Sequence, residues 1–247
     1  MKKVLPQSRL LKRLPRKALD ALSALVILVT VLSLFFVTKL TYPQDSDSVK
    51  AGNFAIYKGS EKREAAALMF NVYEGADVIA EILTILRKYT AKATFFIGGV
   101  WAENNQETIL NIAKNGHEIG CHGYLHKDHA KLSVEQNKEE IVKTNRLLKE
   151  ITGKPVSLFA PPSGSFGENT VTACRALGLK MILWTKDTID WRDKDPSILI
   201  KRATKNAKSG DLILMHPKSQ TLAALPQIIE AYLGGGMELL TVSEVIV

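Results

Sequence analysis

Short apolar runs alternate with amphipathic stretches along the part of the chain that follows residue 53. Continuous apolar runs of this length predict buried strands, and the stretches between them predict helices. The helix expected after Asp77, its predicted cap, has one apolar face, made by Ile79, Ile82, Leu83 and Leu86. The seven runs are AAALMF (65–70), ATFFIG (93–98), HEIGC (117–121), VSLFAP (156–161), KMILWT (180–185), DLILMH (211–216) and ELLTVS (238–243).

A second helix is marked at both ends. Ser133 and Gln136 have the spacing of a capping box, and Gly153, followed by Lys154 and Pro155, is a typical helix end. Alternating strands and helices predict a parallel sheet covered by helices. Seven such units indicate an α/β fold of the (β/α) barrel type with about seven parallel strands, and an open doubly wound sheet is the alternative.

The N-terminal part has a different pattern. Residues 21–38 form an uncharged run between Asp20 and Lys39, and a helix of this length spans roughly 27 Å. We expect a transmembrane anchor at 21–38, a basic cytoplasmic tail at 1–20, a linker at 39–53 and an extracytoplasmic domain at 54–247. A cleavable signal peptide is the alternative, but the run is long for one and no small-x-small cleavage site follows it.

The charge supports this division. The formal net charge is +8, but residues 1–39 hold eight Lys or Arg and one Asp, so the rest of the chain is nearly neutral. The basic excess therefore indicates membrane topology, and it does not predict nucleic-acid binding. The chain also has no P-loop or dinucleotide fingerprint, which argues against a nucleotide enzyme.

Two cysteines, Cys121 and Cys174, are separated by 53 positions. Cys121 falls at a predicted strand end and Cys174 within a predicted helix. An exported domain permits a disulfide without requiring one. We expect two unpaired, mostly buried thiols, with a disulfide as the alternative.

Distinctive polar residues follow five of the predicted strands. In parallel α/β folds the functional site lies at the carboxyl ends of the strands, so these side chains are expected to meet at one face of the sheet. The residues are Asn71, His122, Ser163, Asp187 and His216.

His122 and His126 form an H-x3-H pair beside the strand end GHEIGC. Two imidazoles four residues apart on a turn can bind a divalent metal such as Zn²⁺. Loop histidines without a metal are the alternative, because the spacing alone is weakly specific.

Asp187, Asp190 and Trp191 form a second group, and His216 comes later in the chain. A carboxylate beside an imidazole orients the ring and favours its protonated form, which can deliver a proton to a leaving amine. Turn formation by the two aspartates and a strand-end role for the histidine are the alternatives.

With these motifs, residues 54–247 resemble the polysaccharide deacetylase (NodB-homology) family, most closely its sporulation-associated bacterial branch. The segments that carry the resemblance are AIYKG, KATFFIGG, NGHEIGCHGYLHKD, ITGKPVSLFAPPSG and GDLILMHP. The resemblance implies a distorted (β/α) barrel and a reaction in which a bound metal assists hydrolysis of an N-acetyl group on a cell-wall or chitin-like glycan.

Roles follow from the resemblance position by position. His122 and His126 match the metal histidines, and Asp190, Trp191 and His216 match the group that supplies the general acid. The implied substrate groove comprises Pro161, Pro162, Ser163, Gly164 and Asp187.

Three positions depart from the family pattern. Asn71 stands where the family has its aspartate base, Val72 where it has the metal carboxylate, and Ala160 where it has the arginine that holds the base. An arginine without its anionic partner is costly when buried, so the losses at 71 and 160 form a physical set. Losing a general base typically lowers the rate by about 10²–10⁴-fold.

Replacement ligands are available nearby. Glu74 is the first to consider as a metal ligand, followed by His129 and Cys121. Two functions remain open. One is a membrane-anchored glycan deacetylase with weak or altered activity, and the other is a non-catalytic protein that binds envelope glycans or acts as a scaffold.

Overall fold

The structure is a computed structural model that describes residues 22–23, 25–33 and 54–247. The chain divides into two units, 1–48 and 49–247. In the first unit, residues 22–23 and 25–33 are helical and exposed, and no helix in the described part of the chain is long and apolar enough to cross a membrane. Most of the predicted anchor, the tail at 1–20 and the linker lie outside the described residues, so they stay predictions.

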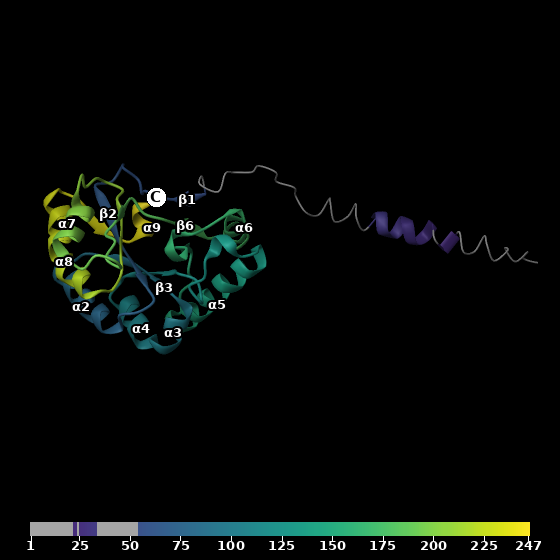
Figure 1. Cartoon of the computed structure of the whole chain (residues 1–247), viewed down its shortest axis with the longest axis horizontal. Coiled ribbons are helices and arrows are strands. Elements are labelled where there is room, and N and C mark those ends of the chain that lie inside the picture. Colours follow the sequence, from purple (N-terminus) through teal and green to yellow (C-terminus); the bar gives the residue numbers. More distant parts are fainter. Residues whose placement is uncertain (1–21, 24, 34–53) are drawn as a thin grey trace, which may run out of the picture. The chain divides into compact units, whose positions relative to one another are not determined.

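The second unit is built on one sheet in which every strand pairing is parallel (Figure 1). The order is β1-β6-β5-β4-β3-β2-β8-β7, and β9 pairs with β2. The strands are β1 (Ala55–Ile56), β2 (Ala65–Val72), β3 (Ala93–Ile97), β4 (Glu118–Cys121), β5 (Leu158–Phe159), β6 (Lys180–Ile182), β7 (Lys186–Asp187), β8 (Leu212–Met215) and β9 (Glu238–Leu240).

All seven predicted apolar runs contain strands, and the parallel α/β class is confirmed. Two short strands, β1 and β7, were not predicted, because neither lies in one of the seven apolar runs, whereas the equally short β5 does. These two strands end the sheet order, and no pairing between them joins the described strands into a ring. The fold is therefore a parallel half-barrel, and the predicted barrel is correct in class but not in closure.

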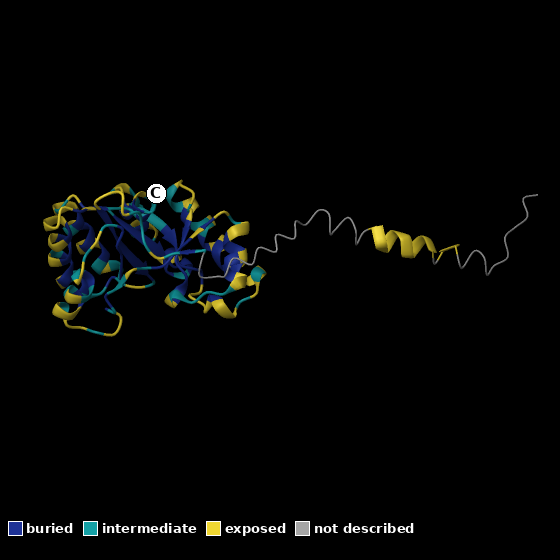
Figure 2. Cartoon of the chain, turned by 90° about the horizontal axis from the view of Figure 1, so that it is seen from above, coloured by how far each residue is buried: buried dark blue, intermediate teal, exposed yellow. Residues whose placement is uncertain are grey.

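Helices form a continuous layer against the sheet. Contacts run from α7 to α8, α2, α4, α5 and α6, and the outward surfaces of these helices are exposed while the strands are buried (Figure 2). The helices of this unit are α2 (Ala76–Lys88), α3 (Gly99–Asn104), α4 (Gln106–Lys114), α5 (Val134–Thr152), α6 (Glu168–Ala176), α7 (Pro196–Thr204), α8 (Ser219–Gly234) and α9 (Val242–Val245), with short 3-10 turns η2 (His129–Lys131) and η3 (Pro162–Gly164).

The helix ends test the local predictions. The capping box of α5 is confirmed, since Ser133 Oγ accepts the Gln136 N–H and Gln136 Oε1 accepts the Ser133 N–H, and α5 ends at Gly153 with φ 72°. The four apolar residues predicted for α2 are buried, but Asp77 lies in its first turn and the cap is Gly75. Gly75 has φ 77°, and a side chain there would collide with the Pro217 carbonyl.

The sheet register aligns the candidate residues. On β2, Phe70 pairs with Met215 of β8, and Val72 pairs with Ile97 of β3. Ile97 in turn pairs with Cys121 of β4. The residues that come next in β8 and β4 are His216 and His122, so the carboxyl ends of β2, β4 and β8 meet at one edge.

Both cysteines are free and buried, which confirms the expectation of two unpaired thiols. Cys121 and Cys174 belong to the same apolar cluster, between β4 and α6. Burial raises the pKa of each thiol to about 12, so neither is a ready nucleophile or metal ligand.

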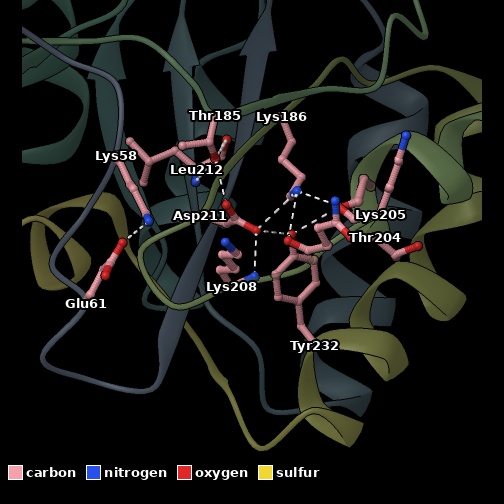
Figure 3. A network of polar contacts seen from close by, with 12 residues as sticks. Lys58, Glu61, Thr185, Lys186, Thr204, Lys205, Lys208, Asp211, Leu212 and Tyr232 are labelled. Atoms are coloured by element: carbon pink, nitrogen blue, oxygen red, sulfur yellow. Dashed lines mark hydrogen bonds and ion pairs between the residues drawn. The ribbon is translucent and has the colours of Figure 1, made fainter.

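The opposite end of β8 is held by a buried carboxylate (Figure 3). Asp211 accepts hydrogen bonds from Thr185 Oγ1 at 3.1 Å, the Lys208 N–H at 2.9 Å and the Tyr232 hydroxyl at 3.0 Å. Lys186 Nζ lies 3.5 Å away and donates to the Lys205 carbonyl at the end of α7. This network ties β7, β8, α7 and α8 together at the amino-terminal side of the sheet.

Candidate active site

A pocket of about 490 Å³ opens at the carboxyl ends of the strands. Eight of its lining residues were singled out from the sequence, namely Asn71, Glu74, His122, His126, Ser163, Asp187, Trp191 and His216. Three others were not: Tyr73, Trp184 and Leu214. The pocket confirms the prediction that one face of the sheet gathers the distinctive polar side chains.

The two histidines of the H-x3-H pair face this pocket together. Their ring centroids are 5.1 Å apart. His122 is almost fully buried, and its Nδ1 lies 2.8 Å from the Ala160 carbonyl oxygen. Since a carbonyl only accepts, Nδ1 carries the proton and Nε2 keeps the free lone pair. Burial, with a smaller contribution from His126, lowers the His122 pKa to about 3, so the ring is neutral at pH 7.

This arrangement fits two protein ligands of a divalent metal. A metal-bound imidazole commonly donates its other ring N–H to a carbonyl, as His122 does to Ala160. His126 is also kept neutral, because burial lowers its pKa. Catalytic zinc usually has three protein ligands, but no group of three His, Cys, Asp or Glu side chains within the described residues is placed to hold a metal. A metal held by this pair would take its remaining ligands from water or from a bound substrate.

The replacement ligands considered from the sequence do not complete this pair. Glu74 lies at the pocket rim, where its carboxylate contacts the Lys218 ammonium. His129 is fully buried against Phe159, and its Nδ1 is 2.7 Å from Asn137 Oδ1. Cys121 belongs to the apolar core.

The carboxylate–imidazole pair is fully built. Asp190 has no exposed surface, and its Oδ1 accepts from His216 Nδ1 at 2.7 Å. Its Oδ2 accepts from the His216 backbone N–H at 2.6 Å and from the Thr221 hydroxyl. The Gln220 side chain donates to the Asp190 carbonyl. The imidazole is therefore fixed by Asp190 at Nδ1, which leaves Nε2 free to meet a ligand.

The segment between Asp187 and Asp190 is strained. Ile189 has φ 55°, an unfavourable conformation for a β-branched residue, and such strain is concentrated at functional sites. The Ile189 N–H donates to Asp187 Oδ1 at 2.8 Å. Arg202 donates to the Thr188 carbonyl and secures the segment from α7. Asp187 thus presents an oriented carboxylate to the pocket, and burial raises its pKa.

Asn71 contrasts with this pair. Asn71 is 4% exposed, and its Oδ1 has no hydrogen-bond partner among the described residues. Val72 belongs to the helix-facing core, because neighbouring residues of a strand point to opposite faces. Ala160 is fully buried in an apolar cluster with Met69 and Leu158. Positions 71, 72 and 160 therefore supply neither a carboxylate nor an arginine to the pocket.

Aromatic side chains form much of the remaining wall. Trp191 is 60% exposed at the rim, and Trp184 and Tyr73 lie deeper. Of the predicted groove residues, Ser163 and Asp187 line the pocket, whereas Pro161, Pro162 and Gly164 form the adjoining turn and do not line it. Gly164 has φ 66°, and a Cβ there would lie 2.7 Å from the Trp184 ring. The sequence marked the strand before Trp184 but gave no sign that its indole leaves the core.

Comparison with known proteins identifies the family. A family model described as polysaccharide deacetylase matches residues 58–182, just over half of the chain. The chain belongs to the polysaccharide deacetylase family. Members of this family are generally metal-dependent, in accord with the two histidines of the pocket.

Two Bacillus relatives show the range of similarity. YlxY of Bacillus subtilis, an uncharacterized protein, is 38% identical over 208 residues, which are 83% of this chain and 65% of the relative. A peptidoglycan-N-acetylglucosamine deacetylase of Bacillus cereus is 32% identical over 172 residues, 67% of this chain and 80% of the relative. The chain thus spans slightly less than two thirds of YlxY.

Among solved structures, BA3943 of Bacillus anthracis matches with a TM-score of 0.76 and 34% identity, covering 78% of this chain and 69% of that protein. BA3943 is described as a pseudoenzyme of the CE4 family. A BA3943 mutant with restored enzymatic activity matches equally well, at 33% identity over 78% of this chain and 71% of the mutant.

Proposed function

We propose that this pocket binds an N-acetylated cell-wall glycan and that the natural chain hydrolyses its acetamide weakly or not at all. The observation that carries the proposal is the asymmetry of the pocket. His122, His126, Asp190 and His216 are retained in a consistent geometry, whereas the base position holds the neutral Asn71.

Glycan binding is supported by the shape and composition of the pocket. About 490 Å³ accommodates a sugar unit with its N-acetyl group, since small-ligand pockets are typically 300–1,000 Å³. The indoles of Trp184 and Trp191 offer flat apolar surfaces for the C–H faces of a sugar, and Asp187 offers an acceptor for hydroxyls. The Bacillus cereus relative is named for action on peptidoglycan N-acetylglucosamine.

Weak hydrolysis follows from the chemistry of the base side. An amide cannot take a proton from water at neutral pH, and loss of a general base typically lowers the rate by about 10²–10⁴-fold. Glu74, the carboxylate three residues further along the chain, is paired with Lys218 at the pocket rim. On the acid side, His216 Nε2 is free to donate a proton to the leaving amine while Asp190 holds Nδ1.

His122 and His126 are the residues that would hold a metal in this pocket. A bound divalent metal supplies polarisation of the acetyl carbonyl and activation of water. The two rings contribute neutral, oriented nitrogens, and the Ala160 carbonyl fixes the tautomer of His122.

Of the two forms of this proposal, glycan binding without any turnover has support of its own. The joint absence of the base and the arginine favours it, because both losses fall on the same step. The similarity to the BA3943 pseudoenzyme also supports binding without turnover.

We also propose that the domain is held outside the cell membrane by residues 21–38. The support is the uncharged run preceded by a basic segment in the sequence. Protease treatment of intact protoplasts should digest the domain and leave an N-terminal tag protected. Protection of the domain would contradict this topology.

Binding and turnover of the natural chain are to be measured separately. Calorimetric titration with chitooligosaccharides and with solubilised peptidoglycan should show binding, and acetate release should be weak or absent. Trp191→Ala should weaken binding, because it removes the exposed indole. Absence of binding to both glycans would refute the proposed glycan binding. Efficient acetate release would refute the claim that hydrolysis is weak or absent.

A further inference from the structure

The turn between the two pocket histidines is held by α5 from outside the pocket. The buried face of α5 carries three polar side chains about one turn apart, namely Asn137, Glu140 and Thr144. Asn137 holds His129, and Thr144 bonds to the Glu140 carbonyl within the helix. Glu140 is the one of the three that contacts the turn between His122 and His126.

The carboxylate of Glu140 is buried and satisfied by that turn. Its Oε2 accepts the backbone N–H of Tyr124 at 2.9 Å and of Leu125 at 2.7 Å. Its Oε1 lies 3.1 Å from Lys127 Nζ, and the side chain is only 6% exposed. A buried anion needs such compensation, and here the donors come from residues that separate or follow the two histidines.

The turn itself has an unusual conformation. Gly123 has φ 73° and His126 has φ 54°, so left-handed residues stand on both sides of Tyr124 and Leu125. Successive N–H groups in such a turn form a concave nest that suits an anion, and the Glu140 carboxylate occupies it. A left-handed histidine is unfavourable by itself and persists only where the surroundings hold it.

The carbonyls of the same turn are held from another side. Gly99 N–H donates to the Gly123 carbonyl at 2.9 Å, and Val100 N–H donates to the Tyr124 carbonyl at 3.0 Å. The backbone of the turn is thus fixed by α3 through its acceptors and by Glu140 through its donors.

We propose that Glu140 is a positioning residue that sets the relative placement of His122 and His126 in the pocket. The carboxylate touches neither ring, and it acts through the backbone between them. The importance of this spacing for metal binding rests on the proposed function, whereas the effect on the turn does not.

The test compares Glu140→Ala and Glu140→Gln with Glu139→Ala, a matched control one residue earlier on the exposed side of α5. Co²⁺ absorption and Zn²⁺ titration should show a 10- to 100-fold loss of affinity in Glu140→Ala, as is typical for partners that orient metal ligands. Glu140→Gln keeps one acceptor oxygen, so its metal affinity should fall less than that of Glu140→Ala. Glu139→Ala should match the natural chain.

Two further readouts need no metal. Amide hydrogen exchange at Tyr124 and Leu125 should be faster in Glu140→Ala. The ring-proton NMR shifts of His126 should also change, because its ring lies 4.9 Å from the Tyr73 ring. If Glu140→Ala does not fold, Glu140→Gln carries the same measurements with smaller expected effects.

Unchanged His126 shifts and unchanged metal affinity in a folded Glu140 variant would overturn the proposal, even if exchange at the two amides increased. A natural chain that binds no metal would instead count against the proposed function. In that case the His126 shifts and amide exchange still decide whether Glu140 positions the pair.

Discussion

Asn71, which lines the pocket, and Asp190, which lies behind the pocket residue His216, are both buried polar side chains, and they differ in how their oxygens are satisfied. Both Asp190 oxygens accept hydrogen bonds, from the ring and backbone of His216 and from Thr221. The Asn71 oxygen has no partner among the described residues. The oxygens of Asp190 are thus tied to the fold, whereas the oxygen of Asn71 is not.

The difference changes how the retained residues are to be interpreted. Retention of Asp190 and His216 could be taken as a sign of catalysis, but Asp190 also joins the end of β8 to α8. Likewise, His122 connects β4 to the residue after β5 through the Ala160 carbonyl. Structural need accounts for these residues whether or not the chain is an enzyme. Asn71 has no such role and therefore carries more information about function.

The largest effect on stability is expected from Asp190→Ala. It leaves the His216 N–H, the His216 ring and the Thr221 hydroxyl without their acceptor, which should lower the free energy of unfolding by about 3 kcal/mol or more. Apart from the loss of side-chain packing, Asn71→Ala should lower the free energy of unfolding by less than about 1 kcal/mol, because the Asn71 oxygen has no hydrogen-bond partner to lose. Urea unfolding measures both, and equal losses would contradict the comparison.

Asp211→Asn at the other end of β8 should have the next largest effect. The neutral amide loses the ion pair with Lys186 and presents N–H groups where Asp211 now accepts from Tyr232 and Lys208. A loss of about 2 kcal/mol in urea unfolding is expected, with no change in glycan binding. A change in binding would show that the two ends of β8 are coupled, which the comparison does not predict.

A pH-dependent effect, small near neutral pH, is expected from His117, a buried histidine away from the pocket. Burial lowers its pKa to about 4 in the folded state, whereas an unfolded histidine titrates near pH 6.5. Between these values the unfolded state binds more protons, so stability should fall as the pH is lowered from about 6.5 to about 4.

His117→Gln should reduce this slope by at most about 1.4 kcal/mol per pH unit, the value for one proton. Urea unfolding of both proteins at several pH values between 4 and 7 measures it. Parallel stability curves would show that His117 titrates alike in the folded and unfolded states.

The sequence predicted the strands better than the shape of the sheet. A long apolar run such as 65–70 predicts a buried strand. The register of the strands then brings His122 and His216 to the carboxyl-terminal edge of the sheet. Closure of a barrel depends on how the edge strands meet. Here those edges are β1 and β7, which lie outside the seven apolar runs and so could not be recognised from the sequence pattern.

Within the pocket, too, the sequence revealed only part of the structure. The polar residues were found because they interrupt the pattern at strand ends, but Trp184 and Tyr73 look like core residues in a sequence. Thr221 and Glu140 act through contacts 31 and 16 residues away in the chain. No local spacing indicates such partners, so they required the structure.

Acetate release from N-acetylated glycan by the natural chain and by an Asn71→Asp, Ala160→Arg double variant tests the central claim most directly. Asn71→Asp alone should be included, because Ala160 is fully buried among apolar residues and an arginine there challenges folding. If the absence of a carboxylate base at position 71 limits the reaction, a folded variant should release acetate about 10²-fold or more faster than the natural chain. Adding His216→Ala to that variant should remove the gain. Efficient release by the natural chain, with no gain in either variant, would contradict the account.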